Sequence, residues 1–248
     1  MSLGLKGKVA LVTGGSRGIG AAIACRLAAD GADVAITYAT SEAQATEVVR
    51  QIEALGRRGL AIRADNLDAN AMDFAVDETL TKLGRLDILV NNAGILHTAP
   101  LEKLTLEDFE KTITINVRAP FLAAKAAASH LGEGGRIISI GSNLAARAPR
   151  PGLSLYSMSK AALVGMSKAL ARELGPKGIT VNVVQPGSTD TEMNPADGDY
   201  AENQRARMAL PGRFCSPGDI AGVVSWLAGP DGDSVTGSEF TIDRGSNA

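Results

Sequence analysis

The chain has 248 residues, with 25 Lys and Arg against 27 Asp and Glu and a formal net charge of −2. Nucleic-acid-binding domains usually carry a clear basic excess, so this balance argues against a nucleic acid partner. Apolar residues make up 45% and charged residues 21% of the chain, which excludes intrinsic disorder and fits one large α/β domain.

The sequence contains no pattern typical of export, membrane insertion or metal binding. Met1 is not followed by the long apolar segment of a signal peptide, and no apolar run reaches the length of a membrane span. Cys25 and Cys215 stand far apart and outside any Cys/His cluster, so we expect two free thiols and no metal site. These features predict a cytoplasmic protein.

Short β-branched runs alternate with longer helical patterns along most of the chain. Strands are predicted at residues 9–12, 34–38, 60–64, 86–90, 136–140, 179–184 and 240–242. Helices are predicted at residues 19–30, 41–55, 68–83, 105–131 and 155–174, with another after Pro217. Continuous apolar strands separated by helices indicate a parallel sheet covered on both faces. We therefore expect a single-domain α/β fold over residues 1–248, a Rossmann-type doubly wound sheet of about seven strands.

Residues 188–217 interrupt this alternation. The segment is polar and contains Pro195, Pro211 and Pro217. A long irregular segment inside a compact domain is more often a lid than a domain boundary. We predict that it is a substrate lid within the single domain, placed before the last helix and strand.

A glycine-rich loop, Thr13–Gly20, joins the first predicted strand to the first helix. A side chain at Gly14 would spoil the turn, one at Gly18 would hold a pyrophosphate away from the backbone amides, and one at Gly20 would hold the helix off the sheet. The same glycines would suit a tight turn that binds no ligand. Their place between a strand and a helix N-terminus favours a dinucleotide site.

A tyrosine, a lysine and a serine are predicted to meet beside this loop. Tyr156 and Lys160 are four residues apart in a predicted helix, so they share one face. Ser142 ends a predicted strand, at the edge where parallel sheets bind ligands. A free phenol titrates near ~10, and a nearby ammonium favours the phenolate, so we expect Lys160 to lower the pKa of Tyr156. Tyr156 would then exchange a proton with a carbonyl or alcohol oxygen that Ser142 also hydrogen-bonds.

The glycine spacing G-x-x-x-G-x-G, together with Asn91–Gly94 after the fourth predicted strand, resembles the short-chain dehydrogenase/reductase family. The resemblance implies that the catalytic tetrad of that family corresponds to Asn116, Ser142, Tyr156 and Lys160. It also implies that Asn116 anchors a water molecule that relays protons to Lys160. The implied reaction is hydride transfer between a nicotinamide cofactor and a ketone or secondary alcohol.

The loop and the resemblance together assign a cofactor site drawn from most of the chain. Asp65, followed by Asn66, is expected to accept the adenine amino group, whereas Thr189 and Thr191 are expected to bind the carboxamide and the pyrophosphate. The expected cofactor-binding residues are Gly14, Ser16, Arg17, Gly18, Ile19, Gly20, Tyr38, Thr40, Ser41, Asp65, Asn66, Asn92, Ala93, Gly94, Tyr156, Lys160, Pro186, Gly187, Thr189 and Thr191.

The residues near the second strand predict that NADP(H) is preferred and that NAD(H) is the weaker cofactor. NAD-selective sites place an acid at the end of this strand to hold the ribose hydroxyls, but Tyr38 stands there. Arg17 can pair with the 2′-phosphate of NADP, and Thr40 and Ser41 can donate hydrogen bonds to it. A carboxylate at the end of the second strand would repel the phosphate, and its absence removes that barrier.

Within the family, the chain looks most like the 3-oxoacyl-[acyl-carrier-protein] reductases, on Ser16–Arg17, Ala171–Glu173 and Gly178–Asn182. Those enzymes dock an acidic carrier protein on a basic patch. Arg172 of that patch is present, but Glu133 would repel the carrier. We therefore expect a ketoreductase for a small-molecule carbonyl or alcohol, accepting free or thioester 3-oxo compounds, with little advantage from an acyl-carrier protein.

Other functions remain open for the same residues. A non-catalytic protein that senses a dinucleotide would keep the fold, but such a chain should have lost a member of the tetrad. A carbonyl reductase or alcohol dehydrogenase for an unrelated small substrate would keep it, whereas epimerases and dehydratases of nucleotide sugars are usually longer. The family is commonly tetrameric, so a homotetramer is expected, although Asp243–Gly245 departs from the common Asp-Gly-Gly at the subunit contact.

Two aromatic side chains invite functional roles that we do not assign. His97 could act as a second general base, but we expect a loop residue at the pocket rim with no catalytic duty. Trp226 could stack on a ligand, but we expect it in the core.

Overall fold

Seven strands form one sheet in the computed structural model, which describes residues 4–248. The strands are β1 (Val9–Val12), β2 (Asp33–Tyr38), β3 (Gly59–Arg63), β4 (Ile88–Asn91), β5 (Arg136–Ile140), β6 (Thr180–Pro186) and β7 (Glu239–Ile242). Their order across the sheet is β3-β2-β1-β4-β5-β6-β7, and all neighbours are parallel. The predicted Rossmann-type doubly wound sheet is confirmed.

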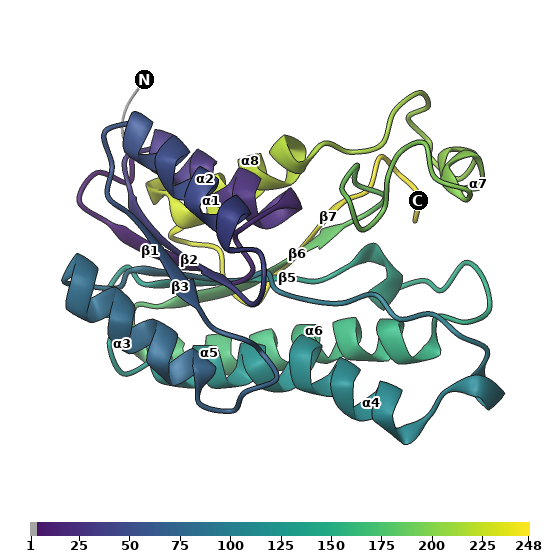
Figure 1. The fold of residues 1–248 in the computed structure, drawn as a ribbon, viewed down its shortest axis with the longest axis horizontal. Helices are drawn as coiled ribbons and strands as arrows, with labels where there is room; N and C mark the ends of the chain where they lie inside the picture. Colours follow the sequence, from purple (N-terminus) through teal and green to yellow (C-terminus); the bar gives the residue numbers. More distant parts are fainter. Residues whose placement is uncertain (1–3) are drawn as a thin grey trace.

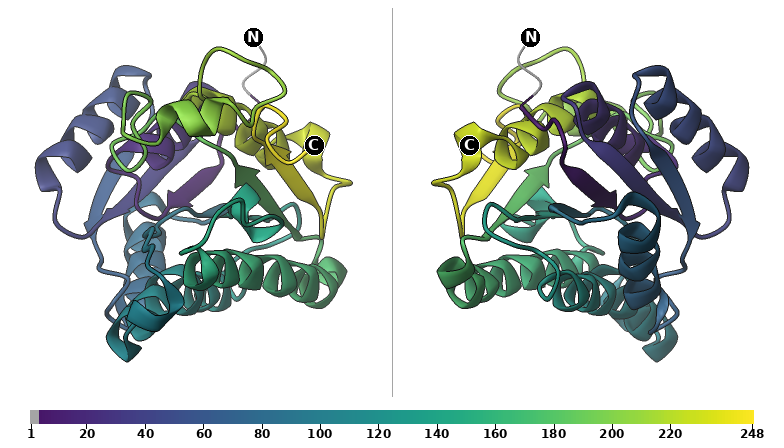
Figure 2. Two further views of the ribbon diagram at one scale, coloured as in Figure 1. Left: turned by 90° about the vertical axis from the view of Figure 1, so that its right-hand side faces the viewer. Right: turned by 90° about the vertical axis from the view of Figure 1, so that its left-hand side faces the viewer.

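Helices cover both faces of this sheet (Figure 1 and Figure 2). One layer contains α1 (Gly18–Ala29), α2 (Glu42–Ala54) and α8 (Pro217–Ala228). The other contains α3 (Ala71–Leu83), α4 (Leu106–Ile113), α5 (Ala119–Ala127) and α6 (Ser154–Leu174). Alternate residues of β1 serve the two layers, since Ala10 and Val12 belong to one apolar core while Val9 and Leu11 belong to the other. A strand buried on both faces must be apolar throughout, which is why its run is continuous.

The winding of the chain reverses between β1 and β4, which are neighbours although β2 and β3 separate them in the sequence. At such a point the loops after the two strands lead to opposite faces and leave a crevice at the carboxyl edge of the sheet. The glycine loop follows β1, and Asn92–Gly94 follows β4. Both sequence motifs therefore lie at this crevice.

The helix predicted over residues 105–131 is interrupted. Thr105 caps α4 as expected and forms a reciprocal capping box with Asp108. A π-helical turn, Thr114–Arg118, then separates α4 from α5, which ends at Ala127. Turns of this kind are frequent at functional sites, and this one contains Asn116.

The predicted lid segment is more ordered than a loop. It contains a short helix, α7 (Ala201–Arg205), and a small apolar cluster of Ala201, Met208 and Phe214. Its two ends are joined, since the Cys215 N–H donates to the Ser188 carbonyl at 2.9 Å. Figure 1 shows the segment, in light green, beside the C-terminus and on the same side of the sheet as α8.

Trp226 of α8 does not lie in the core, so that prediction was wrong. Its side chain is 39% exposed and contacts Phe240 of β7 edge to face, with ring centroids 5.5 Å apart. The reason is that β7 is the last strand of the sheet, where the apolar layer is open at one side. None of the helices within residues 4–248 is long and apolar enough to cross a membrane.

Candidate active site

A cavity of about 1110 Å³ opens at the carboxyl edge of the sheet. Its wall combines the glycine loop, the segments after β2, β3 and β4, the turn after β5, the start of α6 and the lid. All the residues assigned to cofactor binding line it, and so does Ser142. Pockets for one small ligand are usually about 300–1,000 Å³, so this cavity has room for a dinucleotide together with part of a substrate.

The glycine loop has the backbone that a bound pyrophosphate requires. Gly14 and Gly18 have φ values of +62° and +55°, a region that residues with a Cβ rarely adopt. A Cβ at Gly14 would lie 2.9 Å from the Ala93 Cα, and a Cβ at Gly20 would overlap the Gly14 carbonyl oxygen. Gly20 therefore lets α1 approach the loop itself, which brings the helix N-terminus to the crevice.

Side-chain hydrogen bonds lock this loop to the segment after β4. The Thr13 hydroxyl accepts from the N–H groups of Asn92 and Ala93 at 3.0 and 3.1 Å. The Asn92 amide donates in return to the carbonyls of Thr13 and Gly14 at 2.9 and 3.0 Å. The side chain of Asn92 thus holds the glycine loop and the segment after β4 together at the crevice.

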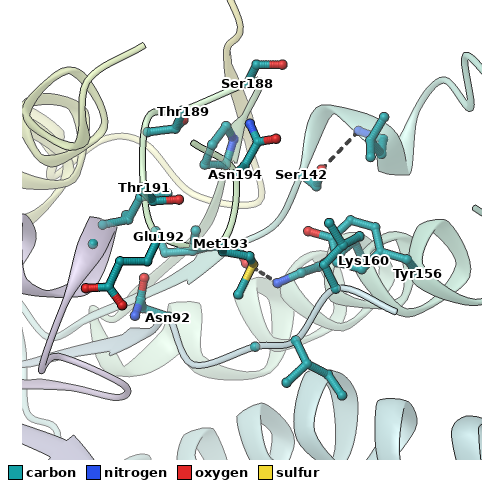
Figure 3. Close-up of a pocket in the computed structure, with 18 of the residues that line it drawn as sticks. Asn92, Ser142, Tyr156, Lys160, Ser188, Thr189, Thr191, Glu192, Met193 and Asn194 are labelled. Atoms are coloured by element: carbon teal, nitrogen blue, oxygen red, sulfur yellow. Dashed lines mark hydrogen bonds between the residues drawn. The ribbon is translucent and has the colours of Figure 1, made fainter. Parts of the chain in front are cut away.

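Tyr156 and Lys160 extend from the first turns of α6 into the cavity, close to Ser142 (Figure 3). The Lys160 Nζ lies 6.0 Å from the centroid of the Tyr156 ring and donates a 2.9 Å hydrogen bond to the Ile140 carbonyl at the end of β5. The Ser142 hydroxyl accepts from the Leu144 N–H at 3.2 Å. Its own proton can still be donated to a substrate oxygen.

Burial shifts the pKa values of Lys160 and Tyr156 in opposite directions. It lowers the pKa of the Lys160 ammonium to about 8, so the lysine is mostly charged at neutral pH. It raises the pKa of the Tyr156 phenol, and the neighbouring Ser142 hydroxyl offsets only part of that rise. Desolvation of the buried phenol thus outweighs that hydrogen bond, and the lowering expected from Lys160 stays a prediction for the protein with its oxidised cofactor bound. A neutral phenol is the form that donates a proton.

Asn116 does not reach the cavity; it supports the residues that do. Its side chain is fully buried, accepts from the Ile95 N–H at 2.9 Å and donates to the Ile95 carbonyl and the Ser159 hydroxyl, both at 3.0 Å. A Cβ on Gly94 would lie 3.2 Å from the Lys160 Nζ and 3.3 Å from the Asn116 Oδ1. The π turn therefore places Asn116 next to the lysine, and the water relay implied for it stays a prediction.

Asp65, Thr189 and Thr191, which were predicted to bind the cofactor, each make contacts within the chain that fix the loops around the cavity. Asp65 accepts from the Leu67 N–H at 3.0 Å, which fixes the loop after β3. The Thr189 hydroxyl donates to the Gly187 carbonyl at 3.1 Å, so its side chain is used within the turn. The Thr191 methyl group lies 3.5 Å from the position that a Gly18 Cβ would take, which sets the start of the lid against the glycine loop.

A carboxylate lies where none was expected. The Glu192 Oε2 lies 2.6 Å from the Arg17 Nη1, and its Oε1 accepts from the Gln44 amide at 3.2 Å. The end of β2 carries Tyr38 and no acid, as predicted, but the expectation did not cover an acid that comes from another segment of the chain. Glu192 is far from Arg17 in the sequence, so only the placement of residues 191 and 192 against the glycine loop in the fold reveals the contact.

Two residues near the C-terminus hold the site together and were not predicted as site residues. Asp243 is buried and accepts from the Asn143 side chain at 3.2 Å, which ties it to the turn that begins at Ser142. Arg244 has a φ of +57° and donates to the carbonyls of Leu210 and Pro211 at 3.1 and 3.0 Å. The departure from Asp-Gly-Gly at Arg244 was the available signal, and this side chain fastens residues 210 and 211 to the C-terminal segment.

His97 lies outside the cavity wall, although its neighbours Leu96 and Thr98 belong to it. Its Nε2 lies 3.4 Å from an oxygen of Asp108, so the ring turns toward the start of α4. The structure thus gives His97 no contact with the reacting groups.

Known proteins match the chain over nearly its whole length. A family profile described as enoyl-(acyl carrier protein) reductase matches residues 14–247. A short-chain dehydrogenase from Burkholderia cenocepacia, crystallised in complex with NADP, is 59% identical with a TM-score of 0.97, covering 99% of this chain and 100% of its own. A blue fluorescent protein from a metagenomic library, in complex with NADPH, is 54% identical with a TM-score of 0.97 and the same coverage. The cyclic-di-GMP-binding biofilm dispersal mediator protein of Escherichia coli is 44% identical over 96% of each chain.

Proposed function

The chain belongs to the short-chain dehydrogenase/reductase family, and from that premise we propose that it is an NADP(H)-dependent ketoreductase. One observation carries the proposal. The hydroxyls of Tyr156 and Ser142 and the Lys160 ammonium share one cavity with the glycine loop. A proton donor is thus placed within the same space as a dinucleotide site, which is what carbonyl reduction needs.

The residues divide the work of reduction as follows. When bound, the reduced nicotinamide supplies the hydride that reaches the carbonyl carbon. Tyr156 donates its phenolic proton to the carbonyl oxygen, and Ser142 donates a hydrogen bond to the same oxygen and stabilises its developing charge. Lys160, held by the Ile140 carbonyl, keeps a positive charge beside the phenolate that remains. Asn116 fixes the backbone at Ile95, whose neighbour Gly94 lies beside the Lys160 ammonium.

Two features support NADP(H) over NAD(H). Tyr38 ends β2 in place of an acid that would hold the ribose hydroxyls, and Arg17, Thr40 and Ser41 line the same end of the cavity. The Burkholderia and metagenomic relatives bind NADP and NADPH. We expect kcat/KM to favour NADPH, and Arg17→Ala to reduce that preference. Comparable kcat/KM values for the two cofactors would contradict it.

The substrate is proposed to be a small ketone, including free and thioester 3-oxo compounds. Arg172 is exposed on α6, as a carrier-binding patch requires, but Glu133 lies beside Gly178 and brings a like charge toward an acidic carrier. The test is kcat/KM for an acetoacetyl carrier protein against acetoacetyl-CoA at low and moderate salt. Similar values support the proposal, whereas a strong carrier preference that salt removes would contradict it.

Residues 188–217 are proposed to close over the substrate. Met193, Tyr200 and Gln204 of this segment line the cavity. Figure 3 shows Met193 directed into the cavity, on the side of Lys160. Closure of such a lid would exclude water from the proton transfer.

A panel of ketones, assayed with NADPH and with NADH through the absorbance of the reduced nicotinamide, tests the proposed activity. We expect NADPH consumption with at least one 3-oxo ester or thioester and formation of the matching alcohol. Absence of turnover across the panel, with dinucleotide binding intact, would favour the second candidate. That candidate is a binding protein without turnover, which the name of the E. coli relative brings into consideration. The presence of all four tetrad residues favours the enzyme.

A further inference from the structure

Glu192 joins three parts of the molecule at the outer end of the cavity. It belongs to the lid, and its carboxylate is paired with Arg17 of the glycine loop at 2.6 Å. Its other oxygen accepts from Gln44 of α2 at 3.2 Å. In Figure 3 Glu192 lies on the side of the pocket opposite Tyr156 and Lys160, so it takes no part in the proton transfer.

The surroundings of this carboxylate are those of an anion site. Arg17, Thr40, Ser41 and Gln44 line a shallow depression, open to solvent, at the N-terminus of α2. Ser41 is the N-cap residue of α2, yet its side chain makes no capping hydrogen bond. The two residues that bond Glu192, Arg17 and Gln44, thus line the same depression as Thr40 and Ser41, whose hydroxyls suit a phosphate, and Glu42 is the acid that also lines it.

We propose that Glu192 occupies the anion position that Arg17 offers to the 2′-phosphate, so that NADP(H) binding exchanges a carboxylate of the lid for the phosphate. The inference rests on the proposed use of NADP(H). Glu192 is then a specificity-determining residue, because only a cofactor that carries the 2′-phosphate displaces its carboxylate from Arg17. The lid contact between Glu192 and Arg17 would then persist with NAD(H) and open with NADP(H).

Because the Arg17–Glu192 ion pair is exposed to water, breaking it costs little free energy. The side chains of Arg17 and Glu192 are 57% and 58% exposed, and ion pairs so open to water contribute little stability. A phosphate carries more charge and can bond the guanidinium through two oxygens, so it is the stronger partner. If Glu192 stayed beside the bound phosphate, the two anions would repel each other.

The test measures binding of two cofactor fragments to the full chain, so no turnover is needed. Adenosine 2′,5′-bisphosphate carries the phosphate in question, and adenosine 5′-monophosphate lacks it. Both are titrated calorimetrically into the wild type, Glu192→Gln and Glu202→Gln. Glutamine keeps the shape of Glu192 and removes its charge. Glu202 is the matched control, since this lid residue does not line the cavity and forms no ion pair in the described chain.

We expect Glu192→Gln to bind the bisphosphate about three- to tenfold more tightly than the wild type, as removal of an exposed ion pair and a like charge predicts. The gain should shrink at high salt, because salt screens exposed charges. The affinity for the monophosphate should stay unchanged, and Glu202→Gln should behave as the wild type. In an Arg17→Ala background the Glu192→Gln change should lose most of its effect, which excludes a general disturbance of the lid.

Two results would overturn the inference in distinguishable ways. If the bisphosphate binds more tightly than the monophosphate but equally to the wild type and Glu192→Gln, the exchange is wrong while the cofactor preference stands. If the two fragments bind the wild type equally, the NADP(H) preference itself is wrong and the exchange falls with it.

Discussion

At the scale of residues, the proposed chemistry depends on a lysine and a tyrosine whose charged forms are both made less stable by burial. The pKa of Lys160 falls to about 8 and that of Tyr156 rises above its ordinary value. Near neutral pH this leaves a charged lysine beside a neutral phenol. The pair is therefore arranged for proton donation to a carbonyl, and the lysine is the first of the two to titrate as the pH rises.

The pH dependence of kcat/KM for the ketone should show this order, since it reports groups of the enzyme before the ketone binds. Because Lys160 loses its proton near a pH of about 8, kcat/KM should fall along an alkaline limb near that value. Lys160→Arg should lower kcat/KM and remove the limb, since a guanidinium stays charged. The measurement is kcat/KM for the ketone against pH for both proteins. A wild-type plateau that continues well beyond this pH would contradict the role of Lys160.

Stability should move in the opposite direction over the same range. Between about 8 and the ordinary value of 10.5, the unfolded chain binds more protons at Lys160 than the folded chain does. The contribution of Lys160 to the free energy of unfolding therefore rises with pH. Denaturant titrations of the wild type and Lys160→Met should show this difference. A steeper alkaline loss of stability in the wild type than in the variant would contradict it.

At the scale of elements, the two ends of the proposed lid are hydrogen-bonded to each other, and Arg244 of the C-terminal segment bonds its second half. Arg244 adopts a φ of +57°, which costs a residue with a Cβ roughly 1–2 kcal/mol. Its guanidinium returns part of that cost through the bonds to the Leu210 and Pro211 carbonyls. The strained backbone thus serves the placement of the lid rather than the stability of the sheet.

Arg244→Gly should loosen the lid with little change in Tm, because glycine removes the backbone strain while the lid bonds are lost. Trypsin should cut after Arg205 and Arg207 several times faster than in the wild type. Arg147→Ala is the control, since Arg147 contacts the Ser246 carbonyl but not the lid. Unchanged cleavage in Arg244→Gly would show that the lid does not depend on this residue.

The sequence predicted the bounds of strands and helices well where they depend on neighbouring residues, such as an apolar run or a capping residue. Strands β1 and β5 begin and end at the predicted residues, and Thr105 caps its helix as expected. The start of α3 was predicted three residues early, at Asp68, because the Asp68 carboxylate bonds the Asn70 N–H in a turn before the helix. The π turn was missed, since one inserted residue scarcely alters apolar spacing over a long helix.

The residues of the candidate site that belong to sequence motifs could be predicted, whereas contacts between distant segments could not. Tyr156, Lys160 and Ser142 were identified through the resemblance to the short-chain dehydrogenase/reductase family, and they do line one cavity with the glycine loop. The contact of Glu192 with Arg17 and the role of Asp243 could not be predicted, because they join segments far apart in the sequence. The direction of the Tyr156 pKa shift depends on burial, which the sequence does not contain.

At the scale of the whole molecule, one helical layer carries an unusual number of exposed apolar side chains. Leu106 of α4, Phe121 of α5 and Met158 of α6 are all exposed, with Leu106 at 74%. Figure 1 shows these three helices in the same layer. Exposed apolar side chains on neighbouring helices are a common feature of protein contacts, and the expected homotetramer would cover these three between identical subunits.

Phe121→Glu should therefore disrupt the assembly, because it places a charge in a buried helix contact. Light scattering of the wild type should give about four times the 25.5 kDa of one chain, and the variant should give a smaller mass. Phe74→Glu is the matched control, since Phe74 on α3 is 50% exposed against 49% for Phe121 but lies outside α4, α5 and α6. A wild-type mass of one chain would contradict the tetramer, and dissociation by Phe74→Glu alone would place the contact elsewhere.

The central claim, that Tyr156 donates the proton in an NADPH-dependent carbonyl reduction, is tested most directly by Tyr156→Phe. The ring still fills its place beside Lys160 and only the hydroxyl is lost, so NADPH should bind nearly as in the wild type. The measurement is kcat for ketone reduction, with the Kd for NADPH determined on the same preparations. The account predicts a loss of kcat of at least about 10³-fold with little change in Kd. A variant that retains activity within about tenfold of the wild type would contradict it.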